Sequence, residues 1–125
     1  MYDALIVGAR CAGAPTALLL ARKGYKVLLL DRGTFPSDMP FSNHYMHQSG
    51  SARLKRWGLL DALKATNCPP IVTNHFDYGD FRLTGSPVPT VDGVTEAFAP
   101  RRLKLDPILV DAAVQAGAEL RENFT

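Results

Sequence analysis

The chain has 125 residues, of which 46% are hydrophobic and 21% are charged, and its formal net charge at pH 7 is +2. These values are ordinary for a globular domain, and the length allows one domain with a modest core. The small charge, with no basic run between aromatic residues, argues against a nucleic-acid partner. The apolar runs are too short to span a bilayer, so we expect no membrane span. Two cysteines do not form a disulfide framework, which favours a cytoplasmic location.

The first 32 residues follow the order strand, glycine turn, helix, strand, acid. Tyr2 to Val7 form a continuous apolar run, which predicts a central parallel strand covered on both faces. The segment GARCAG (residues 8–13) follows, and then a helical stretch through Lys23. Lys26 to Leu30 predict a second strand, which Asp31 closes. This order is typical of a nucleotide-binding βαβ unit.

Each part of the turn has its own physical role. Gly8 allows a tight exit from the strand, and Gly13 lets the helix pack closely against the sheet. Backbone N–H groups between them would point at a pyrophosphate, with help from the helix dipole. Pro15 fits the first helical turn, where its missing N–H has no partner to lose. Small apolar residues recur at helical spacing and predict the inner face: Ala14, Ala17, Leu18 and Ala21.

The acid that closes the second strand bears on which nucleotide is bound. Asp31 lies twenty-three residues after Gly8, close to the usual separation for an acid that binds a ribose. It would repel a 2′-phosphate, so NADP is disfavoured at this site. FAD and NAD both present the ADP ribose, and these residues alone do not separate them. A nucleotide-free α/β domain with a glycine turn is the remaining alternative.

One position departs from the usual fingerprint, because Arg10 stands where the middle glycine is expected. That glycine normally lets the backbone approach the phosphates. An arginine there must either point its side chain away or curl it over the ligand as a charge partner. The neighbouring Cys11 lies near a helix N-terminus, a setting that lowers a thiol pKa, although a small residue packed under the turn is the favoured interpretation over a redox role.

With the rest of the chain, the sequence predicts an α/β, Rossmann-like fold with a parallel sheet and a small antiparallel excursion. Residues 1–125 are expected to form a single partial domain, and its sheet is expected to be incomplete at the C-terminus.

Trp57 is expected in the core or in helix packing. His44 and His47, with Asp38 nearby, are too few ligands for a metal site, so none is predicted. The expected elements are a loop over Phe35 to Gly50, a helix from Ser49 or Ser51 to Trp57, a short helix over Leu60 to Ala65, the antiparallel excursion over Ile71 to Val91, a strand over Glu96 to Ala99, a helix from Asp106 to Ala116 and a strand over Ala118 to Asn123.

Three stretches resemble a known family. VGARCAGAPTALLLARKGYKVLLLDR (residues 7–32) resembles the N-terminal motif of FAD-dependent oxidoreductases of the aromatic-hydroxylase and geranylgeranyl-reductase superfamily, which often replace the middle glycine and carry an acid followed by arginine. Arg102-x-x-Leu105-Asp106 is similar to the family's R-x-x-L/F-D segment, whose arginine contacts the flavin nucleotide. Leu54 to Thr66 is similar to the helical segment beside the flavin domain. The resemblance covers nearly the whole chain.

The resemblance implies an N-terminal segment that holds the ADP half of FAD in a monooxygenase-like or reductase-like enzyme. The family's enzymes are several times longer, so the isolated chain is expected to be incomplete and inactive. The complete enzyme would act on a small-molecule substrate, with NADH or NADPH as electron donor. No catalytic residue is assigned. The expected cofactor-binding residues are Gly8, Arg10, Cys11, Ala12, Gly13, Asp31, Arg32 and Arg102.

Other interpretations stay open. Arg102 is expected to face the flavin from a strand end, with Arg101 solvated; two surface arginines before a helix are the alternative. The loop over His44 to Gln48 lies either near the flavin ring or in solvent. An NAD-dependent dehydrogenase would share the same βαβ start, and a truncated, non-catalytic nucleotide-binding remnant would fit the length.

Overall fold

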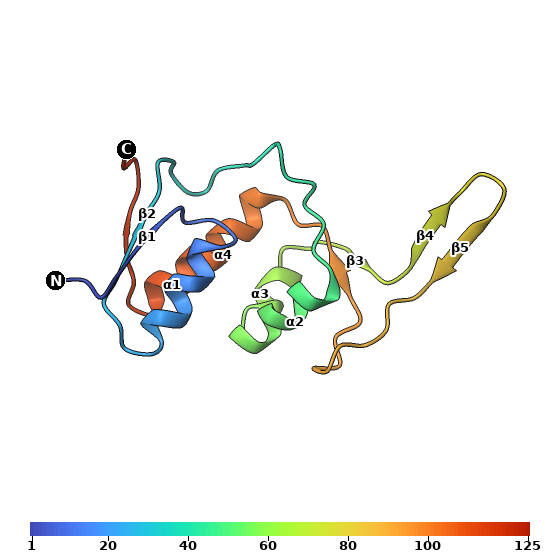
Figure 1. Ribbon diagram of the computed structural model, residues 1–125, viewed down its shortest axis with the longest axis horizontal. Coiled ribbons are helices and arrows are strands. Elements are labelled where there is room, and N and C mark those ends of the chain that lie inside the picture. Colours follow the sequence, from blue (N-terminus) through green and yellow to red (C-terminus); the bar gives the residue numbers. More distant parts are fainter. The chain divides into compact units, whose positions relative to one another are not determined.

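The computed structural model describes all 125 residues, and they form two compact units (Figure 1). The first unit comprises residues 1–40 and 101–125, and the second comprises residues 41–100. The first unit contains one sheet and two helices, and the second contains two small sheets and two helices. The expectation of a single partial domain over residues 1–125 stays a prediction.

The first unit contains a three-stranded parallel sheet. Its strands are β1 (Ala4–Val7), β2 (Val27–Leu30) and β7 (Glu119–Arg121), in the order β1-β2-β7. In the β1–β2 pair, Ala4 lies opposite Val27 and Val7 lies opposite Leu30. The β1–β2 and β2–β7 pairs are both parallel. Helix α1 (Gly13–Ala21) connects β1 to β2, and helix α4 (Arg102–Gln115) precedes β7. The predicted parallel βαβ unit is therefore confirmed.

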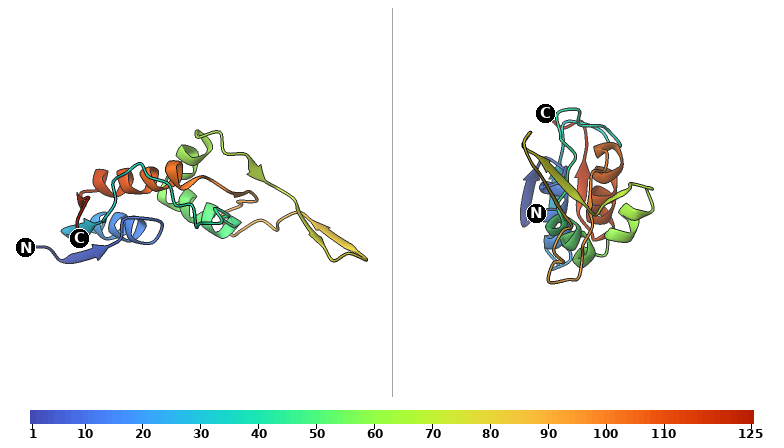
Figure 2. Two further views of the ribbon diagram at one scale, coloured as in Figure 1. Left: turned by 90° about the horizontal axis from the view of Figure 1, so that it is seen from above. Right: turned by 90° about the vertical axis from the view of Figure 1, so that its right-hand side faces the viewer.

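Helices α1 and α4 lie side by side on the same side of the sheet (Figures 1 and 2). The predicted inner face of α1 is confirmed, since its four small apolar residues are all buried. Pro15 is buried in the first turn of α1, as expected. From the other elements, the core of this unit takes Val27, Leu29, Leu105, Leu109, Val110 and Ala113.

The prediction that the first strand is central is wrong for these residues. β1 forms the edge of the sheet, and β2 takes the central position with all four residues buried. Leu5 and Val7 are 60% and 79% exposed, whereas Ala4 and Ile6 alternate with them and are half-buried. The helices cover one face only, and an apolar run does not reveal which of its faces is covered.

Helix α4 begins at Arg102, four residues earlier than predicted. The N–H groups of Lys104 and Leu105 donate to the carbonyl of Arg101, which closes the first turn. Pro107 therefore lies inside the helix, where it lacks one backbone donor near the N-terminal end. Arg101 and Arg102 consequently stand at a helix start, and the expectation of a strand end is wrong.

The second unit combines two helices with two small antiparallel sheets. The helices are α2 (Gln48–Trp57) and α3 (Leu60–Lys64), and Gly58, with φ at +78°, ends α2. Strands β3 (Pro70–Ile71) and β6 (Ala97–Phe98) pair antiparallel. A hairpin of β4 (Asn74–Asp77) and β5 (Arg82–Gly85) confirms the predicted antiparallel excursion. Trp57 is half-buried at the end of α2, and the core of this unit includes Leu54, Leu63 and Phe98.

None of the four helices combines the length and the apolar content that a membrane crossing needs.

Adjacent leucines of α1 provide a matched test of this packing. Leu18 is fully buried, and Leu19 is 40% exposed. We expect Leu18→Ala to lower the free energy of unfolding by about 3 kcal/mol and Leu19→Ala by less than about 1 kcal/mol, because only the first leaves a closed cavity. Urea unfolding of the intact protein measures both. Equal losses would contradict the assigned inner face.

Candidate cofactor site at the glycine loop

A cavity of about 730 Å³ opens in the first unit where the glycine loop meets the end of β2. Six of the eight predicted cofactor-binding residues line it: Gly8, Arg10, Ala12, Gly13, Asp31 and Arg32. Cys11 and Arg102 do not line it. Five further residues line it that were not predicted to bind the cofactor: Val7 and Leu30, which end the two predicted strands, and Met39, Phe124 and Thr125, which carry no motif.

The two glycines of the loop are required for different reasons, backbone conformation at Gly8 and close packing at Gly13. Gly8 has φ at +98°, in the left-handed region that glycine adopts without strain. A Cβ on Gly13 would lie 1.7 Å from the Gly8 carbonyl oxygen. Both glycines are therefore required by the backbone itself, as the sequence predicted, and α1 begins directly against the end of β1.

At the start of α1 the Ala14 N–H donates to the Arg10 carbonyl and Pro15 has no N–H, so the N–H groups of Ala12 and Gly13 are the ones open to a ligand. Ala12 is the N-cap and offers no side-chain hydrogen bond, and no acidic residue stands in the first turn. Such a helix start carries unpaired donors and the positive end of the helix dipole. The loop can therefore bind an anionic group through its backbone alone.

Asp31 ties this loop to the end of β2. Its Oδ2 accepts a hydrogen bond from the Ala9 N–H at 2.7 Å, and its Oδ1 accepts one from the Gly33 N–H at 2.8 Å. The carboxylate is buried and keeps further lone pairs on the side of the cavity that it lines. The sequence predicted an acid that binds a ribose, and it missed this second role of holding the loop.

Asp106 is the residue of this region that sequence reasoning passed over. Its side chain is fully buried and accepts hydrogen bonds from Arg10 Nη1 at 2.7 Å and from Arg102 Nε at 2.7 Å. The Cys11 Sγ donates to the same carboxylate at 3.5 Å. The only sequence signal was its place at the end of the Arg102-x-x-Leu105-Asp106 segment.

The two adjacent arginines have different surroundings. Arg102 is 13% exposed and turns to Asp106, whereas Arg101 is 70% exposed and pairs with Asp38. Burial is the largest single effect and opposes the charge of Arg102, but the hydrogen bond to Asp106 and the nearby negative charges together outweigh it, so the pKa of Arg102 is raised. The same kind of bond from Arg101 lowers the pKa of Asp38. Whether Arg102 faces a flavin stays a prediction.

Cys11 has a raised pKa, contrary to the sequence expectation. Although the residue is exposed, desolvation of its thiol raises the pKa to about 11, and the charge of Asp106 adds to the effect, while Arg102 opposes it. The helix N-terminus would favour a thiolate, but these tertiary neighbours decide the outcome.

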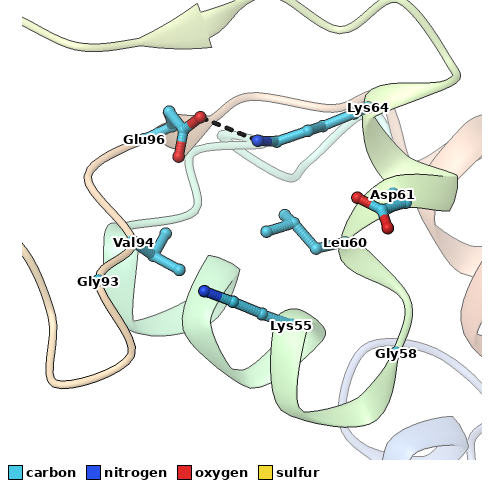
Figure 3. Close-up of a pocket in the computed structure, with 8 residues that line it drawn as sticks. All are labelled: Lys55, Gly58, Leu60, Asp61, Lys64, Gly93, Val94 and Glu96. Carbon is cyan, nitrogen blue, oxygen red and sulfur yellow. Dashed lines mark hydrogen bonds and ion pairs between the residues drawn. The ribbon is translucent and has the colours of Figure 1, made fainter.

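The second unit has a smaller cavity of about 310 Å³, lined by residues of α2, α3 and the segment before β6 (Figure 3). Lys64 Nζ bonds Glu96 Oε1 at 2.9 Å across it, and Lys55 Nζ donates to the Asp92 carbonyl at 2.8 Å. Its lysines therefore already have partners. No three His, Cys, Asp or Glu side chains gather in a way that could hold a metal ion.

The sequence of the chain matches one family model over residues 1–124, and that model describes an FAD binding domain. The chain belongs to this family. The match confirms the predicted FAD cofactor and the Rossmann-like fold class, and it favours FAD over the NAD-dependent alternative.

Relatives of this FAD-binding chain include one protein named as a hydroxylase and one named as a monooxygenase. Aklavinone 12-hydroxylase DnrF of Streptomyces peucetius is 31% identical over 135 residues, which covers 95% of this chain and 27% of the hydroxylase. Squalene monooxygenase of Candida glabrata is 36% identical over 70 residues, covering 56% of this chain and 14% of that enzyme. The chain thus spans about a quarter or less of these curated relatives.

Solved structures agree on the fold. The myxobacterial chondrochloren halogenase CndH, described as FAD-dependent, has a TM-score of 0.86 at 21% identity, covering 98% of this chain and 28% of the halogenase. OxyS anhydrotetracycline hydroxylase of Streptomyces rimosus has a TM-score of 0.75 at 25% identity, covering 98% of this chain and 24% of the hydroxylase. In both, the matching part is a small share of a longer chain.

The raised pKa of Cys11 gives a direct test. With a pKa of about 11, only about one thiol in a thousand is ionised at pH 8, so we expect slow alkylation by iodoacetamide that accelerates about tenfold per pH unit towards pH 11. Mass spectrometry of the Cys11 and Cys68 peptides follows both thiols in one sample, and Cys68 serves as the reagent control. A Cys11 rate that levels off by pH 8 would contradict the environment described.

Proposed function

We propose that the intact protein is a flavin-dependent oxidoreductase of the monooxygenase kind and that these residues hold the ADP half of its FAD. The observation that carries the proposal is the single cavity that brings together the glycine loop, the start of α1 and Asp31. The family match and the two relatives named as a hydroxylase and a monooxygenase support it.

The chain's own groups divide the work of binding. The N–H groups around Ala12 and Gly13 would hold the pyrophosphate, because no side chain caps this helix start. The absence of side chains at Gly8 and Gly13 allows the phosphates to approach the backbone. Asp31 would accept hydrogen bonds from the ribose, and Arg32 lines the rim of the same cavity.

FAD, when bound, supplies the redox chemistry, and the residues described here bind and orient it. A small-molecule substrate, with NADH or NADPH as electron donor, belongs to the same proposal by resemblance. So does a cytoplasmic location. None of the cavity-lining residues is assigned as a catalytic acid, base or nucleophile, so substrate chemistry would depend on groups other than these.

The first test is the absorbance of the purified protein. We expect the intact protein to carry FAD with visible flavin bands, released on denaturation and identified by chromatography. Residues 1–125 alone should bind FAD weakly, because the family's enzymes add further flavin contacts. A stoichiometric yellow complex of residues 1–125 would contradict this second expectation, and a colourless intact protein that rejects added FAD would contradict the function.

Gly13→Ala should disrupt the phosphate-binding loop and weaken FAD binding. The new Cβ would meet the Gly8 carbonyl oxygen at 1.7 Å, so loop and helix must separate. We expect FAD affinity to fall by at least about tenfold, since the phosphate-binding N–H groups move. Titration with FAD by flavin fluorescence measures it. Gly85→Ala is the matched control, because a Cβ there meets nothing within 4 Å, and it should leave affinity unchanged.

Arg102→Ala should weaken FAD binding in the intact protein, whereas Arg101→Ala should have little effect. The two residues are adjacent, but Arg102 is largely buried beside the loop's partner Asp106 and Arg101 is mostly exposed. Flavin occupancy after purification reports the difference, with thermal unfolding recorded for each variant. Unchanged occupancy in Arg102→Ala would remove Arg102 from the cofactor-binding set.

A further inference from the structure

We propose that Arg10 and Asp106 are positioning residues that clamp the glycine loop to the start of α4, so that Arg10 serves the site by holding the loop and not by contacting the phosphates. This inference rests on the proposed FAD-binding function and deepens it. It also selects between the two roles that the sequence left open for Arg10.

The guanidinium of Arg10 is occupied on several sides by protein groups. Nη1 bonds Asp106 Oδ2 at 2.7 Å and reaches the Ser37 carbonyl at 3.4 Å, and Nη2 bonds the Ser37 hydroxyl at 2.9 Å. The Phe35 ring lies beneath the guanidinium carbon, 5.4 Å from its centroid. The side chain is only 22% exposed. Arg10 therefore joins the loop to two other segments, which a glycine at this position cannot do.

Asp106 is the fixed point of this arrangement. It is fully buried, and its two oxygens accept from Arg10 and Arg102, with the Cys11 thiol as a third donor. A buried carboxylate is tolerated when it is paired and hydrogen-bonded, and removing it would leave two partly buried cations without their acidic partner. The side chains of Arg10 and Cys11 therefore both donate hydrogen bonds to one carboxylate on α4.

Asp31 completes the restraint from the other side, because it accepts from the N–H of Ala9. Three consecutive loop residues, numbers 9 to 11, are therefore held by two buried carboxylates. The helix-start N–H groups that follow are left free of side chains. In a preorganised loop of this kind, less ordering has to occur when the ligand binds, which increases affinity.

A double-mutant cycle in the intact protein tests the clamp. The variants are Arg10→Gly, which restores the usual glycine, Asp106→Asn, and the double variant, each titrated with FAD at low and moderate salt. We expect Arg10→Gly to weaken binding by about fivefold, Asp106→Asn by at least as much, and the double variant by no more than about twofold beyond Asp106→Asn, because both remove one interaction. Arg10→Lys should recover part of the loss, since lysine keeps the charge but lacks the planar fork.

Salt dependence separates the clamp from a phosphate contact. If Arg10 bonds Asp106, the Arg10→Gly variant should show the same dependence of FAD affinity on salt concentration as the parent protein. If Arg10 instead contacts a phosphate, salt screens that contact, so the Arg10→Gly variant should show a weaker dependence of FAD affinity on salt. A weaker dependence overturns the proposal. The proposal is also overturned if the Arg10→Gly protein binds FAD as tightly as the parent protein. It is overturned as well if the two single-variant losses of FAD affinity multiply in the double variant.

The apo protein gives a readout that does not depend on FAD. Desolvation is the main cause of the raised pKa of Cys11, and the charge and hydrogen bond of Asp106 add to it, so Asp106→Asn should move the pH profile of Cys11 alkylation partly to lower pH. An unchanged profile in a folded variant would show that Asp106 does not contact Cys11, and it would overturn Asp106 as the common anchor of loop residues 10 and 11. If the parent protein binds no FAD, the proposed function fails while this measurement still decides the geometry. If Asp106→Asn does not fold, the Arg10→Gly and Arg10→Lys titrations and their salt slopes decide.

Discussion

The site depends on two buried carboxylates that hold one short loop. Asp31 accepts from the backbone of Ala9, and Asp106 accepts from the side chains of Arg10 and Cys11. Their strands and helices are far apart in sequence, so the loop is fixed only once β2 and α4 have packed on α1. The glycines at either end then make the close turn, and the helix start presents its N–H groups outwards. Local geometry and tertiary packing are thus both required to form the anion-binding surface.

Much of the fold was predictable because its signals are local. The glycine turn and the small residues at helical period in α1 each follow from a few neighbouring residues, and both are confirmed as structural features, while ribose binding by the acid after β2 stays a prediction. The misses have a common cause. The edge position of β1 depends on which faces the helices cover, the start of α4 on hydrogen bonds to Arg101, and the raised pKa of Cys11 on desolvation of its thiol beside Asp106. Each of these three features depends on tertiary contacts, so the neighbouring residues in the sequence do not reveal it.

Arg10 replaces the middle glycine of the nucleotide-binding motif, and its hydrogen-bond partners explain how the loop accommodates it. From sequence, an arginine in place of glycine leaves two opposite roles open. In the structure its guanidinium has an acid, a hydroxyl, a carbonyl and an aromatic ring as neighbours, all within the first unit. The substitution therefore comes with its own set of supporting residues. A motif search that scores the glycine alone would undervalue this chain, because the compensating residue stands ninety-six positions away.

The edge strand β1 has a practical consequence for work on these residues. One side of its backbone pairs with β2, and the other side pairs with no strand here, while Leu5 and Val7 expose apolar side chains. Such an edge is a template on which a second chain can add a strand. The small net charge of +2 offers little repulsion against that contact. The strand that leads into the cofactor loop is therefore also the part of this sheet at which a further strand can pair.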